Sequence, residues 1–277
     1  MVAEPSEFAA VPDEMLAEAR EIVGAAAAGG VVLRLVGGLA VLATSPDRGF
    51  ARRPVRDIDL VGLRRQARRV PPTLDALGYQ ENRHVRFATA GAVMQFFRRC
   101  VHVAPDGRQA HDDDRIDVYL DAFRLDHEIA LKDRLPGGAD TVPAADVVLI
   151  KLQRAAPSYE DLRDVVALLK DLRLDRFDEP GVVNLDYLAQ LCSRDWCLHH
   201  DVTASLRRCR ERLAEFGLDA GQETRVVAAF DEVEAAIAGR PKSLRWRLRS
   251  LPGERLPWTD GVDEREGQRL ALLEGER

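Results

Sequence analysis

The sequence predicts an α/β (α+β) protein in which a mixed sheet with flanking helices comes first and a helical region follows. Short β-branched runs alternate with helix-like segments up to about Gly138, which is typical of such a sheet. After Pro143 the segments have the apolar spacing of helices. The 277 residues are enough for two modest domains that share a sizeable core. We therefore expect one domain at residues 1–140 and a second, helical domain at residues 141–277.

The first half opens with a helix from Pro12 to Ala28, which Gly29-Gly30 close. The run from Val31 to Val36 follows as a buried strand, and Gly37-Gly38 turns the chain into a helix that begins at Leu39. The later elements are, in order, a loop at Ser45–Pro54, a strand at Asp57–Leu63, a helix at Gln66–Leu77 interrupted by Pro71-Pro72, strands at Arg83–Ala88 and Val93–Arg98, a polar loop at Pro105–Asp114 and a strand at Arg115–Ala122.

The second half is expected to contain five helices. Their predicted ranges are Ala144–Arg154, Tyr159–Leu172, Leu185–Leu191, Val202–Phe216 and Thr224–Ala238. The charged stretch Pro252–Arg277 is expected to form one exposed helix with a frayed end.

Composition is ordinary for a globular protein, with 46% hydrophobic and 31% charged residues. A net charge of -6 means that a nucleic-acid partner would need a local basic patch. No apolar run approaches the ~18 residues of a membrane span, and residues 1–14 lack the order of a signal peptide. We therefore expect no membrane partner. The four cysteines form no CxxC pair and no disulfide framework, so we expect a reducing cytoplasm.

Asp57 and Asp59 form the central candidate site. In a strand alternate side chains face opposite ways, so Ile58 and Leu60 would face the core while the two carboxylates project together from the other face. Two such carboxylates repel each other unless a cation lies between them. A hard divalent ion such as Mg²⁺ or Mn²⁺ meets this need through oxygen ligands. The alternative for this pair alone is an exposed strand with two surface aspartates.

Two further features support the site. Gly37-Gly38 at a strand-to-helix junction would let the backbone approach a ligand and hold phosphate oxygens with helix amides. The alternating strand from Arg115 is expected to carry Asp117, Tyr119 and Asp121 on one face. Asp117 would then supply a third carboxylate to a two-metal site.

Lys151 lies on a predicted helix that is otherwise apolar all round between Val147 and Leu152. Such a helix is buried, so the ammonium needs water, a carboxylate or a phosphate as its partner. Two interpretations stay equally open: the ammonium contacts a nucleoside triphosphate, or it reaches solvent at the edge of the helix. On the next helix, Asp161 and Asp164 lie together beside the core stripe. We favour a salt bridge, with Lys151 as one partner, for Asp161 and a functional role for Asp164.

The order of these pieces resembles the polymerase-β-type nucleotidyltransferase superfamily. Within it, the chain resembles the AbiEii/AbiGii toxin family, which includes the MenT-type toxins. The resemblance rests on Gly37-Gly38-Leu39-Ala40, on Arg53-Pro54-Val55-Arg56-Asp57-Ile58-Asp59-Leu60, on the lysine helix Asp146–Arg154 and on the helix Tyr159–Leu169, and it spans Val31 to Leu191 in pieces. Val55 stands where the family usually has Thr or Ser.

The resemblance implies a nucleotidyltransferase catalytic domain followed by a helical domain that completes the active-site cleft. The implied reaction moves an NMP from an NTP to an acceptor hydroxyl, on a tRNA end or a protein, and the implied role is that of a toxin with a cognate antitoxin. Arg53 and Lys151 would offset triphosphate charge, and Asp164 would be a site residue. The alternatives are an antibiotic nucleotidyltransferase with a small-molecule acceptor and, as Val55 favours, a catalytically silent interaction protein.

The remaining polar groups predict less. The six histidines show no convincing cluster in the sequence, and His199-His200 are expected on a helix surface. Two local basic patches could contact RNA phosphates or be solvated faces paired with nearby Glu. The first comprises Arg207, Arg208, Arg210 and Arg212, and the second Lys242, Arg245, Arg247 and Arg249.

Overall fold

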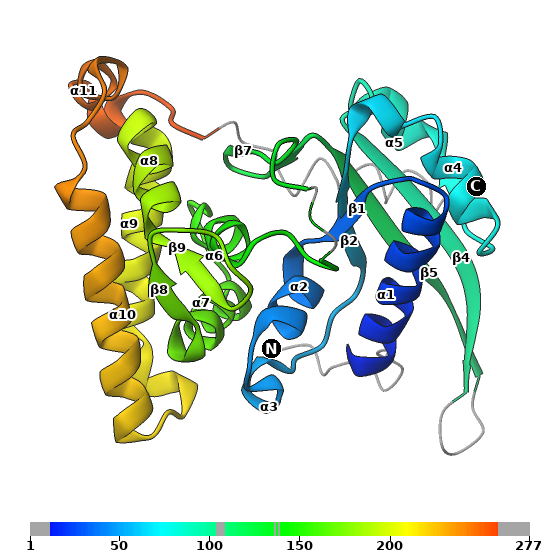
Figure 1. Cartoon of the computed structure of the whole chain (residues 1–277), viewed down its shortest axis with the longest axis horizontal. Coiled ribbons are helices and arrows are strands. Elements are labelled where there is room, and N and C mark those ends of the chain that lie inside the picture. Colours follow the sequence, from blue (N-terminus) through cyan, green and yellow to red (C-terminus); the bar gives the residue numbers. More distant parts are fainter. Residues whose placement is uncertain (1–11, 104–108, 136, 138, 260–277) are drawn as a thin grey trace.

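The computed structural model describes residues 12–103, 109–135, 137 and 139–259. Its centre is a five-stranded sheet with the strand order β1-β2-β5-β4-β3 (Figure 1). The strands are β1 (Leu33–Leu35), β2 (Ile58–Gly62), β3 (Gln80–Asn82), β4 (Val93–Val103) and β5 (Gln109–Leu120). β2 and β5 run parallel, whereas the other neighbours are antiparallel. The prediction of a mixed sheet followed by a helical region is confirmed.

One face of the sheet forms the core. The register pairs Ile58 with Ile116 and Leu60 with Val118, and all four side chains are buried. Helix α1 (Pro12–Ala28) packs on the sheet (Figure 1), and its Glu18 accepts a hydrogen bond from the Tyr79 hydroxyl at 2.7 Å. The range of α1 is as predicted. The opposite face is left for the polar side chains of the same strands.

Short helices surround the sheet. They are α2 (Gly37–Thr44), α3 (Arg48–Ala51), α4 (Val70–Asp75) and α5 (Arg83–Ala88), with a 3-10 turn at Arg64–Gln66. The prediction that Pro71-Pro72 interrupts a helix is wrong, because the two prolines occupy its first turn, where no intrahelical N–H partner is lost. The predicted loop at Ser45–Pro54 contains α3, which Asp47 caps by accepting from the Phe50 N–H at 3.1 Å.

Two predictions in the first half are wrong, one of a strand and one of a loop. Arg83–Ala88 is the helix α5, because the Asn82 side chain caps it by accepting from the His84 N–H at 3.1 Å. Within the predicted loop Pro105–Asp114, residues 109–114 belong to β5, which pairs with β4 as a long antiparallel ribbon. Residues 104–108 lie outside the described residues. Polar side chains on both strands hid the ribbon, of which the Arg98–Asp114 ion pair at 2.8 Å is one link.

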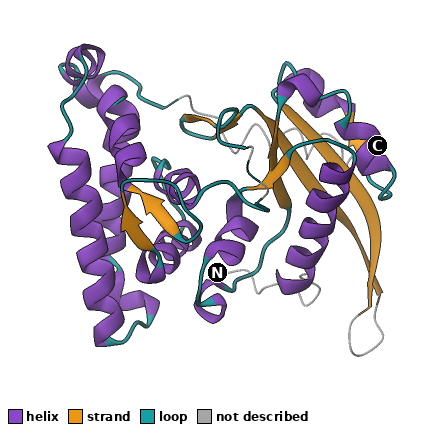
Figure 2. Cartoon of the chain, in the orientation of Figure 1, coloured by secondary structure: helices purple, strands orange, loops and turns teal. Residues whose placement is uncertain are grey.

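The second half is mainly helical, and of the two small two-stranded sheets only the β8–β9 pair lies in it (Figure 2). Its helices are α6 (Ala144–Leu152), α7 (Tyr159–Asp171), α8 (Leu185–Arg194), α9 (Trp196–Glu211), α10 (Ala220–Gly239) and α11 (Leu244–Ser250). Sequence spacing missed the hairpin β6 (Ala122–Arg124) and β7 (Glu128–Ala130), and the parallel pair β8 (Arg173–Asp175) and β9 (Val182–Asn184).

Several helices in this half differ from the prediction: α8 ends at Arg194, α10 begins at Ala220, and α11 was not predicted. α9 begins at Trp196 because the Asp195 carboxylate caps it by accepting from the Cys197 N–H at 2.8 Å. Of the predicted C-terminal helix, residues 252–259 contain only a 3-10 turn at Gly253–Arg255, and residues 260–277 lie outside the described residues. None of the described helices combines the length and apolar character that a membrane crossing requires.

Helix α2 joins the two halves, since it contacts β2 on one side and both α6 and α7 on the other. All nine residues of α6 are buried, including Asp146 and Lys151, which agrees with its all-round apolar pattern. Just before α6, the Leu35 N–H donates to Asp140 O at 2.8 Å and the Val142 N–H donates to Leu35 O at 3.2 Å. The chain is therefore tied to β1 where it passes into the helical half.

Candidate functional site

Three carboxylates meet on the polar face of the sheet. Asp59 of β2 and Asp117 of β5 are direct register partners on parallel strands, and Asp57 lies just before β2. One carboxylate oxygen from each of the three residues lies within 4.8 Å of those of the other two. Within the described ranges this is the one group of His, Cys, Asp and Glu side chains arranged to hold a metal ion. The convergence expected from strand alternation is therefore found.

The site is electrostatically unfavourable for three free carboxylates. Burial and the neighbouring charge of Asp117 raise the pKa of Asp59 to about 7, against the opposing effect of Lys151 and Arg53. Burial also raises the pKa of Asp117, although the Arg115 charge and the hydrogen bond from Gln95 oppose that rise. A divalent cation would relieve this repulsion, and its preference for oxygen ligands matches the donor set.

Arg115 is the cation that the chain itself brings to these carboxylates. Its guanidinium forms an ion pair with Asp57, and its Nε lies 3.4 Å from Oδ2 of Asp117. The Arg115 side chain is 41% exposed, so it lies at the open side of the site. Sequence reasoning missed this residue. Alternation does place Arg115 on the same face as Asp117, two positions later. Nothing in the order of the chain, however, links Arg115 to Asp57.

The two glycines at the start of α2 lie against the site. Gly37 has a φ of +65°, and a Cβ there would collide with the carboxylate of Asp59, coming within 3.1 Å of its Cγ. A Cβ on Gly38 would come within 2.8 Å of Nη2 of Arg53. The sequence predicted that these glycines let a ligand approach the backbone. In the structure, the space that they leave is occupied by the side chains of Asp59 and Arg53.

The N-terminus of α2 points its free amides at this region. No side chain caps the helix at Val36, whose own N–H donates to Asp59 O at 3.0 Å. The first amides of a helix lack intrahelical acceptors and carry partial positive charge. An anion beside Asp59 would therefore meet the α2 amides and any cation held by the carboxylates together.

An ion-pair cluster joins Arg53 of the first half to Lys151, Asp161 and Asp164 of the helical half, and the charges of Lys151 and Arg53 act on Asp59. Arg53 donates to both oxygens of Asp164, at 2.9 and 2.7 Å. Lys151 lies 3.0 Å from Asp164 and 3.0 Å from Asp161. Asp161 also completes the capping box of α7 with Ser158. The salt bridge favoured for Asp161 is thus present, and Asp164 lies between the two cations that the sequence assigned to the triphosphate.

The cluster is held by its own charges. Burial alone would lower the pKa of Lys151, but Asp164 and Asp161 raise it above its usual value. In the same way, Asp164 outweighs burial and raises the pKa of Arg53. Both side chains therefore stay cationic beside the three site carboxylates. Their contact with a nucleotide stays a prediction, as does a functional role for Asp164.

One residue expected beside Asp117 lies elsewhere. The chain leaves β5 after Leu120, and Asp121 takes a φ of +68°, so strand alternation stops before it. Its Oδ1 accepts from the Arg64 N–H at 3.0 Å instead. Tyr119 does share the face of Asp117, and burial together with the charges of Asp59 and Asp117 raises its pKa well above the ordinary value.

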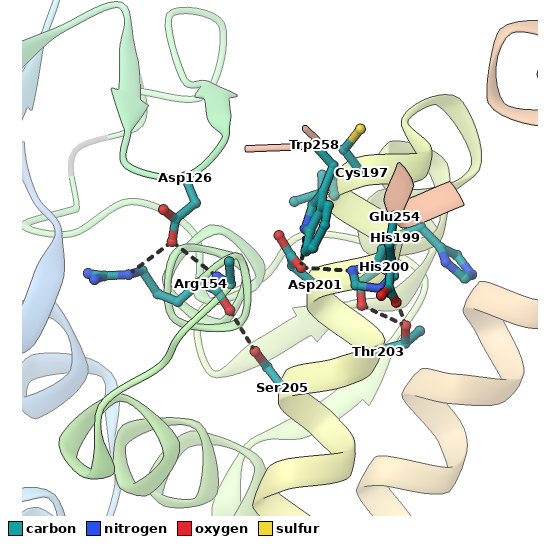
Figure 3. A network of polar contacts seen from close by, with 12 residues as sticks. Asp126, Arg154, Cys197, His199, His200, Asp201, Thr203, Ser205, Glu254 and Trp258 are labelled. Carbon is teal, nitrogen blue, oxygen red and sulfur yellow. Dashed lines mark hydrogen bonds and ion pairs between the residues drawn. The ribbon is translucent and has the colours of Figure 1, made fainter. Parts of the chain in front are cut away.

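A second polar cluster contradicts the expectation that the histidines do not gather. Nε2 of His127 lies 2.7 Å from Oδ2 of Asp201, and Nδ1 of His200 lies 2.9 Å from Oδ1 of the same carboxylate. The Trp258 indole donates to Asp201 at 3.0 Å, and His200 also contacts Glu254 at 3.0 Å (Figure 3). This network ties α9 to the β6–β7 hairpin and to the segment after α11.

The basic patch of α9 is largely paired with acids. Arg210 contacts Asp231 and Glu234, and Arg212 contacts Glu215. In the later patch, Arg249 donates to the backbone carbonyls of Gly253, Leu256 and Pro257. The acid pairs agree with the interpretation of the first patch as a solvated face paired with nearby acids, whereas a role of the second patch stays a prediction.

Comparisons with known proteins give only distant likenesses. No protein-family model matches the chain, and no curated protein matches it. Among solved structures, an antigenic nucleotidyltransferase-like protein from Paracoccidioides brasiliensis is similar at 13% identity and a TM-score of 0.40, covering 84% of this chain and 96% of its own. The antibiotic-resistance factor ANT(2'')-Ia is similar at 10% identity and a TM-score of 0.32, covering 88% of this chain and 97% of its own. Neither likeness is strong enough to assign a family or an activity.

Proposed function

We propose that the chain is a metal-dependent nucleotidyltransferase, which moves an NMP from an NTP to an acceptor hydroxyl. The observation that supports this most is the meeting of Asp57, Asp59 and Asp117 beside the uncapped start of α2. Three carboxylates recruit divalent cations, and helix amides recruit phosphate oxygens. A triphosphate is the common ligand that needs both at once.

The residues present fit Mg²⁺ or Mn²⁺. All three donors are carboxylates, without the thiolate or imidazole that softer ions prefer. Bound there, a divalent ion would offset triphosphate charge and orient the phosphates for displacement. Asp57 and Asp59 would hold the ion that contacts the triphosphate, and Asp117 would hold the second ion.

The chain's own groups supply the rest of the chemistry. The amides after Gly37-Gly38 hold phosphate oxygens, and Arg53 offsets charge from the adjoining side. The acceptor oxygen forms a bond to the α-phosphorus, and the bond from that phosphorus to the β-bridging oxygen breaks. Pyrophosphate leaves with the electron pair, while the hydroxyl proton passes to the Asp117 carboxylate. Asp164 keeps Arg53 and Lys151 in place.

The acceptor and the biological role follow from the sequence resemblance alone. A tRNA end or a protein hydroxyl is the proposed acceptor, and a toxin with a cognate antitoxin in the cytoplasm is the proposed role. A catalytically silent interaction protein is the second candidate, and Arg115 favours it. Its guanidinium already offsets the charge of Asp57, so the site does not require a metal ion for charge balance at that residue.

The test is a transfer assay with label in the α-phosphate. Each of the four NTPs is incubated with the protein, Mg²⁺ or Mn²⁺, and one of three acceptors: bulk tRNA, a protein extract or an aminoglycoside. The inactive control is Asp57→Ala/Asp59→Ala, and Asp186→Asn is the matched control because Asp186 is exposed on α8.

Label on one acceptor that Asp186→Asn keeps and Asp57→Ala/Asp59→Ala loses supports the proposal and identifies the acceptor class. Absence of label on every acceptor, together with absence of NTP binding, rules out the enzyme and leaves the silent candidate.

A further inference from the structure

A single row of polar side chains crosses four strands and ends in the carboxylate site. Asn82 of β3 pairs in register with Gln95 of β4, Gln95 pairs with Asp117 of β5, and Asp117 pairs with Asp59 of β2. Side chains at register partners project from the same face of a sheet. The row therefore brings two neutral amides to the edge of a group of acids.

The amides in this row are hydrogen-bonded in series. Nδ2 of Asn82 donates to Oε1 of Gln95 at 3.3 Å, and Nε2 of Gln95 donates to Oδ1 of Asp117 at 2.9 Å. Asn82 and Gln95 are both half-buried, so water competes for these bonds less than it does at the surface.

The direction of this series is fixed at its far end. A side-chain amide could point either way, because its oxygen accepts and its nitrogen donates. The backbone N–H of His84 can only donate, and it donates to Oδ1 of Asn82 at 3.1 Å. The Asn82 nitrogen must then face Gln95, which accepts from it. The Gln95 nitrogen must in turn face Asp117.

We propose that Gln95, oriented by Asn82 and the start of α5, is a positioning residue for Asp117. Its N–H holds Oδ1 of Asp117 and favours the ionised carboxylate. Oδ2, which lies on the side of Arg115 at 3.4 Å, is left for the cation. This inference rests on the proposed function, since it assigns Gln95 and Asn82 to the same metal site. Hydrogen-bond partners of ligating carboxylates commonly set metal affinity.

The test reverses the series without changing any of the three carboxylates. Asn82→Asp keeps an acceptor for the His84 N–H, and Asp caps helices as well as Asn does, so α5 is retained. The new carboxylate cannot donate, so Gln95 turns its NH₂ toward it and presents its carbonyl to Asp117. We expect Mn²⁺ affinity, measured by electron paramagnetic resonance titration, to fall about tenfold or more.

Three variants separate the hydrogen bond from other effects. Gln95→Met removes the donor itself and should lower Mn²⁺ affinity at least as far. Asn82→Ser keeps a neutral cap but cannot reach Gln95, so the fall should be smaller. Gln80→Glu adds the same charge on the same strand at an exposed position, and should bind Mn²⁺ like the wild type.

A second readout in metal-free protein keeps this inference apart from the proposed function. The side-chain amide signals of Gln95, assigned by their loss in Gln95→Met, should shift in Asn82→Asp and stay unchanged in Gln80→Glu. Wild type that binds no Mn²⁺ would overturn the proposed metal site. Unchanged Gln95 signals in Asn82→Asp, unchanged Mn²⁺ affinity in both Asn82→Asp and Gln95→Met, or an equal fall in Gln80→Glu would overturn the role of Gln95.

Discussion

Gly37 lies directly against the carboxylate of Asp59, so closely that a Cβ at Gly37 would collide with that carboxylate. The Val36 N–H donates to Asp59 O at 3.0 Å just before this contact. The glycine pair and the Asp-Ile-Asp sequence are therefore one structural unit. The start of α2 and the acidic strand hold each other in place.

Gly37→Ala should damage both the fold and the metal site. A φ of +65° costs a non-glycine residue roughly 1–2 kcal/mol, and the new methyl group must also displace Asp59. We expect a loss of unfolding free energy of at least about that size in urea titrations, together with loss of Mn²⁺ binding. Gly38→Ala is the matched variant, because Gly38 has no positive φ and its new methyl group meets Arg53 and Val55 but none of the three site carboxylates. A Gly37→Ala protein as stable as Gly38→Ala, with intact Mn²⁺ binding, would contradict the account.

Asp59→Asn should stabilise the metal-free protein at neutral pH. Burial and the Asp117 charge raise the pKa of Asp59 from 3.8 to about 7. Between about pH 4 and pH 7 the folded state holds a proton that the unfolded state has lost, so wild-type stability falls as pH rises through this window. The variant has no such proton and escapes this fall, which is on the order of 3 kcal/mol.

Urea denaturation in EDTA at pH 5 and pH 8 measures this difference. The free energy of unfolding of wild type should drop between the two values by more than that of Asp59→Asn. Added Mg²⁺ should restore wild type at pH 8 and leave the variant unchanged. Parallel pH profiles for the two proteins would show that Asp59 ionises normally.

Arg115→Gln should raise divalent-metal affinity. The Arg115 guanidinium pairs with Asp57 and approaches Asp117, so an incoming ion must displace it. Without that competitor we expect Mn²⁺ to bind about threefold tighter or more, a change of the size of one partly exposed ion pair. Isothermal titration of both proteins gives the ratio. An unchanged affinity would mean that Arg115 does not compete with the metal ion, and a lower affinity would mean that Arg115 assists its binding. Either result would contradict the prediction.

Lys151→Met should cost roughly 3–5 kcal/mol of unfolding free energy, because it leaves the fully buried Asp164 without one of its two cations and also removes the partner of half-buried Asp161. Lys170→Met is the matched control. Lys170 is also buried, but its partners Asp47 and Asp171 are 43% and 20% exposed and can turn to water. Urea titration should show a clearly smaller loss for the control. Equal losses would indicate that burial of the lysine stem, and not the charge cluster, stabilises α6.

Strand alternation was enough to predict the meeting of Asp57, Asp59 and Asp117, because Asp59 and Asp117 lie on strands with a clear apolar opposite face and Asp57 directly precedes one of these strands. Arg115 and Gln95 could not be found in that way. Their roles depend on which strands are neighbours and in which register, and that information is absent from spacing within one strand. The same limit hid the contact of His127 with Asp201, since it joins a hairpin to a distant helix.

Local capping explains the largest error in the fold. Val85 and Phe87 alternate with polar residues in Arg83–Ala88, which favours a strand, but Asn82 supplies a helix cap and Phe87 is 90% exposed. The capping signal was present in the sequence as a lone Asn. It outweighed alternation because no neighbouring strand buries these side chains.

The central claim is that three carboxylates hold a divalent ion together. Titration of Mn²⁺ by electron paramagnetic resonance into wild type, Asp57→Asn, Asp59→Asn and Asp117→Asn tests it most directly. We predict saturable binding by wild type and a loss of about tenfold or more in each variant, because each replaces a charged carboxylate with a neutral amide that offers one oxygen. Wild type that does not bind Mn²⁺, or variants that bind it like wild type, would contradict the claim.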